Sequence, residues 1–500
     1  MPLPTDSKQP WPPSSVPQFD FAVWDEWYSG KFSPAGSPLS TIPLTTGGVT
    51  ERLSGGFVHR HGNQQFGSAS NPRSGSQPVH CPLAVDIAQV SADLLFGDMP
   101  DVRFTSEDPG TTKAQARLEE LLDMGSVQNM LIEAAETCAA LGGSYLRVTW
   151  DKETCDYPFL THVDADRAVP EWRFGMLTAV TFWRETRTEG RGVYRHLERH
   201  EPGVILHGLY LGTADQLGSS VGLEQDPETT GLEPVITLPE AMAKRIDAFY
   251  VPNARPNQRN RGSYLGRADI GGAEDLLDAL DEVYSGLMRD VRLSQSRILV
   301  PSGVLSSNDP TNPRGSGKGM DLDREVFTEI DVPPEGMQPS VVQPDIRVEK
   351  FLLASLDLIK QIVSKAGYSP RTFGLDLAGR TESGTALRIR EQLTYRTLGR
   401  KQRYWETALS HALESLLIVD ASEFGSGVTP ACPDIEWQEA DTSAAELADT
   451  LVMLRNAEAT SIETRVRTLN PTWIDDQVAA EVERIRAENG TIMPPAPTMP

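Results

Sequence analysis

The chain has 500 residues, of which 39% are hydrophobic, and a formal net charge of −24 at pH 7. This length is too great for one ordinary hydrophobic core, so we expect roughly two to four structural regions. A surface that grips nucleic acid by neutralising phosphates should be basic, so the acidic balance argues against a nucleic-acid-binding regulator. It does not exclude DNA that passes nearby without being held.

Cysteine and histidine spacing provides no metal motif. The four cysteines are Cys81, Cys138, Cys155 and Cys432. No CxxC or Cys/His cluster connects them, which favours reduced thiols over a disulfide framework or a zinc site. His59 and His61 have no third ligand nearby, and a solvated loop is the simpler interpretation. We therefore expect no metal and no cofactor.

The N-terminus lacks the basic and then apolar run of a signal peptide. No apolar segment approaches the roughly 20 residues that a membrane span needs. We expect the protein to stay where it is made, or to be built into an assembly there, without a membrane partner.

Residues 80–250 have the mixed pattern of an α+β region. Before them, residues 1–17 are rich in Pro and Ser and are expected to form a mobile arm, and residues 19–31 a short helix with an aromatic face. The expected helices cover residues 82–96, 112–124 and 127–141. The expected strands cover residues 102–104, 145–150, 178–183, 192–199 and 204–211.

A basic cluster follows within residues 249–267. Its members are Arg255, Arg259, Arg261 and Arg267. Such a cluster in an acidic protein could contact phosphate or the acidic surface of a neighbouring subunit. Because the net field of the protein repels DNA, we favour the neighbouring subunit.

A long amphipathic helix is predicted over residues 269–297, about 43 Å at 1.5 Å per residue. Its apolar stripe has a period of 3.6 and consists of Leu276, Leu280, Val283, Leu287 and Val291. Its acidic side carries Glu274, Asp278, Asp281 and Glu282. A core helix of a large α/β protein is the plain alternative for this pattern.

Residues 298–344 form a compact insert with two β-like pieces, at 297–305 and 326–332, around a Gly/Ser/Asn/Pro loop. Gly315–Gly319 suggests a phosphate loop, but the pattern fails. Gly319 follows Lys318 where Ser or Thr is needed, and Asn312 replaces the first Gly. A loop tip is the better interpretation.

A second amphipathic helix is predicted over residues 346–366, with Leu352, Leu356, Ile359 and Val363 in one stripe and further apolar residues beside it. So much apolar circumference requires more than one neighbour. A loop over residues 368–382 follows, and its charged residues are Arg371, Asp376, Arg380 and Glu382.

A third helix is expected over residues 383–419, basic in its first half and apolar in its second. The tail is helical again. Capping-box patterns begin at Ser443 and Thr460, and Asn470 with Pro471 starts a helix that Gly490 ends. The last ten residues are disordered by composition.

Several blocks resemble portal proteins of long-tailed bacteriophages that infect actinobacteria. They are ALGGSYLRVTWD (140–151), HGLYLGT (207–213), the run from YVPNARPNQRNRG to SQSRILVP (250–301), AGYSPRTFGL (366–375) and ESGTALRIRE (382–391). The order of parts is also similar, and the resemblance covers about residues 80–420.

The resemblance implies an α+β portal fold assembled as a cyclic ring, usually of twelve subunits. Its parts would be an N-terminal arm (1–79, partly disordered), a wing (80–267), a first stem helix (268–297), a small α/β clip (298–345), a second stem helix (346–367), a tunnel loop (368–383), a long wing helix with a return segment (384–435), a helical crown (436–490) and a disordered tail (491–500).

The function implied is a channel at one capsid vertex, through which double-stranded DNA is packaged and later ejected. The implied partners are other copies of the chain, double-stranded DNA without sequence preference, the terminase large subunit, the major capsid and scaffolding proteins, and the head–tail adaptor. Assembly would take place in the host cytoplasm. The acidic stem residues would line the channel and the charged loop residues would face DNA, while the stem stripes would pack together. Acids that solvate the outside of the stem are the alternative.

Two other classes compete with this interpretation. Another virion ring protein, such as a capsid or adaptor subunit, would also oligomerise, but two long helices around a small insert are not expected of it. A terminase-type packaging enzyme would need a phosphate loop or paired metal-binding acids, and neither is found. We expect no enzyme activity.

Overall fold

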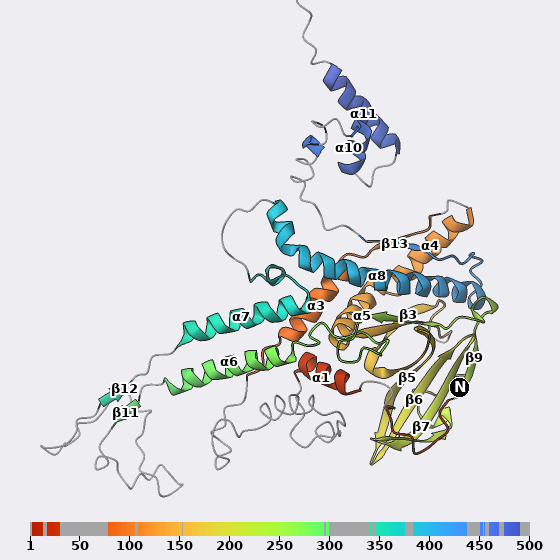
Figure 1. Ribbon diagram of the computed structural model, residues 1–500. Helices are drawn as coiled ribbons and strands as arrows, with labels where there is room; N and C mark the ends of the chain where they lie inside the picture. The colour runs from red at the N-terminus through yellow and green to blue at the C-terminus, as the bar shows by residue number, and fades with distance from the viewer. Residues whose placement is uncertain are drawn as a thin grey trace, which may run out of the picture.

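The computed structural model describes residues 3–13, 18–30, 79–105, 109–152, 154–294, 297–299, 340–342, 347–375, 384–437, 451–453, 455, 460–469 and 475–490. Helices and two antiparallel sheets form an α+β body, and a pair of helices runs away from it (Figure 1). Within these residues, no helix combines the length and the apolar character that crossing a membrane requires.

The predicted helices of the body are confirmed. They are α1 (Gln18–Ser29), α3 (Leu83–Phe96), α4 (Pro109–Met124), α5 (Val127–Leu141) and α8 (Gly384–Glu423). The end of α5 depends on glycine: Gly142 has a φ of 87°, and a Cβ there would lie 2.8 Å from the backbone of Arg267.

The smaller sheet has β2 (Gly143–Thr149) between β10 (Ala248–Pro252) and β3 (Phe159–Asp164). The larger sheet has the order β4 (Ala168–Arg173), β5 (Met176–Glu189), β6 (Gly192–Glu201), β7 (Val204–Thr213) and β8 (Gln216–Val221), and β9 (Val235–Thr237) also pairs with β7. Glu201 pairs with Val204, so Pro202 and Gly203 alone turn the chain between β6 and β7. Of the strands in these two sheets, the sequence predicted β2, β5, β6 and β7 and missed β3, β4, β8, β9 and β10.

The main core lies between α8 and the layer of α3, α4, α5, β2 and β10. The predicted apolar half of α8 is buried here through Trp405, Leu409, Leu413, Leu416 and Leu417. The rings of Phe96 and Trp405 meet edge to face at 4.9 Å. After α8 the chain returns to β13 (Asp434–Glu436), which pairs with β1 (Asp101–Arg103).

The helix pair consists of α6 (Glu274–Leu293) and α7 (Val348–Ala366), and a two-stranded ladder of β11 (Arg297–Leu299) and β12 (Ser340–Val342) lies at its far end (Figure 1). The first helix was predicted to begin at Asp269, which is wrong. Residues 269–272 form a turn in which Gly272 has a φ of 89°, outside the helical region. The predicted strand at 326–332 lies outside the described residues, and β12 was not predicted.

The N-terminal segment was predicted to be mobile, and for residues 3–13 this is wrong. Trp11 is buried and meets Trp183 edge to face with ring centroids 6.2 Å apart. The backbone N–H groups of Leu217 and Gly218 donate to the carbonyls of Gln9 and Ser7. The prediction failed because the surface that covers Trp11 comes from strands about 170–210 residues later in the chain.

The C-terminal helices α10 (Ile462–Leu469) and α11 (Asp475–Gly490) pack through Val466, Val478 and Val482. The N-cap of α10 is Ser461, whose Oγ accepts the backbone N–H of Thr464 at 3.1 Å, and not the predicted Thr460. The predicted caps at Ser443 and Asn470 lie outside the described residues.

Candidate functional site: the helix pair and its junction with the body

Near the body, α6 and α7 share a closed apolar core. Leu277, Leu280, Ile362 and Val363 are fully buried, and they belong to the same core as Phe21, Trp24 and Trp27 of α1. Further out, Gly286 allows the two helices to approach closely, because a Cβ there would lie 3.1 Å from the ring of Phe351. The shared apolar core therefore fixes the inner end of the pair, at Leu277, Leu280, Ile362 and Val363, to the body.

Burial decreases along the pair away from the body. Leu352, Leu353 and Leu356 of α7 are 44%, 69% and 42% exposed. Val291 and Met288 of α6 are exposed as well.

The residues predicted for stem packing therefore fall into three groups. Leu280 and Val363 are buried. Leu276, Val283, Leu287 and Ile359 are half-buried. Val291, Leu352 and Leu356 are exposed. The outer apolar face of the pair has no cover among the described residues of one protomer.

Glu274 was predicted to line a channel, and the structure places it in the interior instead. It is buried, and its Oε1 accepts hydrogen bonds from Arg259 at 2.6 Å and Trp24 at 3.2 Å. Its Oε2 accepts the N–H of Gly272 at 2.8 Å. At the first turn of α6 the carboxylate also complements the helix dipole. Glu274 fastens α6 to α1 and to the segment around Arg259.

Asp281 is likewise not available to a channel. It is buried, and its two oxygens meet the His80 ring at 3.0 Å and the N–H of Cys81 at 2.9 Å. Of the predicted acidic face, Glu282 is exposed and Asp278 is half-buried. Periodicity placed these acids on one side of a helix but could not show that the segment before α3 covers part of that side.

The basic cluster is also used within the protomer. Arg259 pairs with Asp20 at 2.9 Å as well as with Glu274. Arg267 donates to the carbonyl of Gly271 at 3.2 Å. These two arginines therefore have acceptors in the same chain, and contact of the cluster with a neighbouring subunit stays a prediction.

A buried ionic cluster joins the start of the helix pair to α8. Lys401 donates from Nζ to Asp269 at 2.6 Å, to Tyr368 Oη at 2.9 Å and to Ser91 Oγ at 2.6 Å. Asp269 also accepts from Tyr368 and Asn253, both at 2.8 Å. Burial and the neighbouring carboxylate raise the pKa of Tyr368 well above its usual value. The phenol therefore stays protonated and serves as a donor to Asp269.

The predicted loop over residues 368–382 begins, as expected, without a long helix or strand, but its first residues are packed into the body. Tyr368 and Ser369 are buried, and the N–H of Ser369 donates to Thr394 Oγ1 at 2.8 Å. Arg371 lies in a 3₁₀ turn (Pro370–Phe373) and pairs with Glu391 at 3.3 Å. The other charged residues predicted for this loop, Asp376, Arg380 and Glu382, lie outside the described residues.

A second charged group lies apart from the helix pair, in a cavity of about 400 Å³ lined by both sheets. His196 stacks on His207 with an interplanar angle of 10°. Burial, and then the nearby His207, lowers the pKa of His196 to about 4. Burial alone would raise the pKa of Glu198, but Arg147 and the hydrogen bond to His200 hold it well below its usual range. The group therefore contains an ion pair between Glu198 and Arg147 beside the stacked rings of His196 and His207.

Comparison with known proteins identifies the family. No curated protein matches the chain. The family described as "Phage portal protein, SPP1 Gp6-like" matches residues 221–494, more than half of the sequence. The match includes α6, α7 and α8 and the residues between them. The chain therefore belongs to the SPP1 Gp6-like family of phage portal proteins.

Proposed function

We propose that the chain assembles side by side with identical copies into a cyclic ring at one capsid vertex. Through its channel, double-stranded DNA is packaged by the terminase motor and later ejected into the tail. Family membership implies a homo-oligomeric, capsid-associated structural protein without enzyme activity. The finer assignment below extends this to particular surfaces.

The observation that carries the proposal is the apolar outer face of the helix pair. Leu353 and its neighbours on α7 have no cover within the described protomer, and burying one such leucine side chain stabilises by about 1.5–3 kcal/mol. In a cyclic ring each interface joins two different faces of the same molecule. The outer face of α7 from one copy would meet the α6 side of the next.

The channel surface is assigned to the remaining acids of α6. Glu282 is exposed and Asp278 half-buried, so both can face a passage while Glu274 and Asp281 hold the helix in place. Negative charge there keeps the affinity for DNA low, because it repels phosphate, whereas each phosphate neutralised by a basic side chain would add salt-dependent binding affinity. Residues 368–383 would form the tunnel loop at the narrowest point.

The remaining parts follow the portal plan. Residues 298–345 would be the clip that meets the terminase and later the head–tail adaptor. The body would be the wing that contacts the major capsid and scaffolding proteins. Residues 436–490 would form the crown inside the capsid.

The test is the double change Leu353→Asp and Leu356→Asp in the full chain. We expect the unmodified protein to form rings with a central hole in top-view electron micrographs, and we expect the double change to abolish these rings. Circular dichroism should be unchanged, because both side chains are exposed in the protomer.

The matched control is Met176→Asp, which alters an equally exposed apolar residue on β5 in the body. It should leave rings intact. Rings that survive the double change on α7 would contradict the assigned interface, and a protein without any ring would contradict the channel.

A further inference from the structure

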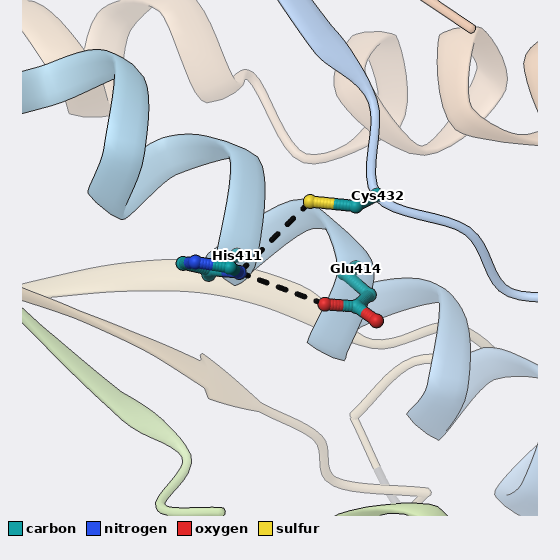
Figure 2. A group of neighbouring side chains, drawn as sticks. All are labelled: His411, Glu414 and Cys432. Carbon is teal, nitrogen blue, oxygen red and sulfur yellow. Dashed lines mark hydrogen bonds and ion pairs between the residues drawn. The ribbon is translucent and has the colours of Figure 1, made fainter. Parts of the chain in front are cut away.

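Three side chains of metal-ligating types come together where the segment after α8 passes beside that helix (Figure 2). The Nδ1 of His411 lies 3.6 Å from Oε2 of Glu414 and 3.9 Å from Sγ of Cys432. All three candidate ligand atoms lie within 4.8 Å of one another. The sequence did not reveal this group, because Cys432 follows the other two by about twenty residues.

Local structure holds the group in place. His411 and Glu414 are three residues apart on α8, so their side chains lie on one face. Cys432 lies on the segment that returns along α8 toward β13, as Figure 2 shows. Ser410 binds this segment by donating to the carbonyl of Pro433. Its Oγ also lies 3.1 Å from the Cys432 sulfur.

We propose that His411, Glu414 and Cys432 form a binding site for a borderline divalent cation of the Zn²⁺ type. An imidazole, a carboxylate and a thiolate are zinc ligands, whereas Ca²⁺ and Mg²⁺ prefer oxygen alone. Bonds of about 2.0–2.3 Å in a tetrahedron separate neighbouring ligand atoms by about 3.3–3.6 Å. The present separations need only small side-chain adjustments to reach these values.

Three protein ligands leave the fourth position to water or to a neighbouring molecule. Bound metal would tie the return segment to α8 beside the β1–β13 ladder. The ion would thus join α8 to the return segment at a second point, next to the hydrogen bond from Ser410 to Pro433.

Arg245 supplies a test specific to this site. Its Nη1 donates to the same Oε2 of Glu414 at 2.7 Å, so a cation must compete with the guanidinium for this oxygen. Removing Arg245 should therefore strengthen metal binding. The ion pair is partly exposed and worth up to about 1 kcal/mol, which corresponds to about five-fold in affinity.

The experiment titrates Co²⁺ into the metal-stripped full chain. Tetrahedral coordination with a thiolate ligand produces intense visible bands and a near-ultraviolet charge-transfer band. We expect one Co²⁺ per chain with these bands, displaced by Zn²⁺. Cys432→Ser and His411→Ala should each weaken binding by about 100-fold or more, and Arg245→Ala should tighten it about five-fold.

Cys155→Ser, a change of another partly exposed cysteine outside the group, should bind Co²⁺ like the unmodified chain. Circular dichroism establishes that each variant is folded. The proposal is overturned if the unmodified chain shows no thiolate band, if the band persists in Cys432→Ser, or if Arg245→Ala weakens binding.

Discussion

Replacing Lys401 by Met should destabilise the protein strongly, because it removes the cation from the buried cluster between α8 and the start of the helix pair. The Lys401 and Asp269 side chains are only 4% and 3% exposed, and their atoms are 2.6 Å apart. Methionine has nearly the same length but leaves Asp269 with only the neutral donors Tyr368 and Asn253.

The expected cost is about 3–5 kcal/mol, since a buried charge that loses its partner keeps its full desolvation penalty. This is a large part of the roughly 5–15 kcal/mol that stabilises a typical domain. Replacing both partners, Lys401→Met with Asp269→Asn, removes both charges. The double variant should therefore be more stable than the sum of the two single losses predicts, by about 2 kcal/mol.

The measurement is the urea midpoint of the full chain at one fixed protein concentration, because assembly contributes to stability. The control is Lys152→Met, which breaks an exposed pair with Glu423 and should cost at most about 1 kcal/mol. If Lys401→Met costs no more than this control, or if the double variant shows no coupling, the cluster does not secure the junction.

Two further predictions concern single titratable side chains. Asp281→Asn should lower the free energy of unfolding by about 1–3 kcal/mol, because it weakens the hydrogen bonds to His80 and Cys81. The control Glu282→Gln changes an exposed side chain and should alter the free energy of unfolding by less than about 0.5 kcal/mol. Equal effects of the two changes would refute the assignment of Asp281 to the interior. Burial lowers the pKa of His196 to about 4 in the folded protein, compared with about 6.5 for an unperturbed histidine. The contribution of this group to the free energy of unfolding is therefore complete above pH 6.5. It is lost as the pH falls toward 4, by up to about 3 kcal/mol. Urea midpoints at pH 7 and 4.5 measure this loss, and His196→Gln should reduce it; an unchanged acid dependence would contradict the buried neutral imidazole.

Local pattern was sufficient for the long helices and their order. The apolar stripe of α7 and the buried half of α8 are regular enough to predict the helix and the side that needs cover, because side chains three and four residues apart share a face. The sequence blocks also led to the portal family, which the family match confirms. Strand β10 was missed because its partner β2 lies about 100 residues earlier in the chain. Strands β3, β4 and β8 pair with neighbouring strands, but β4 contains Pro170 and β8 contains Gly218, and both residue types are uncommon in strands.

The periodic pattern alone determined which residues of this protein share a helical face, and the tertiary structure decided what covers that face. Glu274 and Glu282 both belong to the acidic side of α6, yet only the first is covered, because α1 and Arg259 pack on it. Trp11 and Cys432 have neighbours that come from distant segments. Burial depends on contacts between segments that are far apart in sequence, and the spacing of residues within one segment does not specify those contacts.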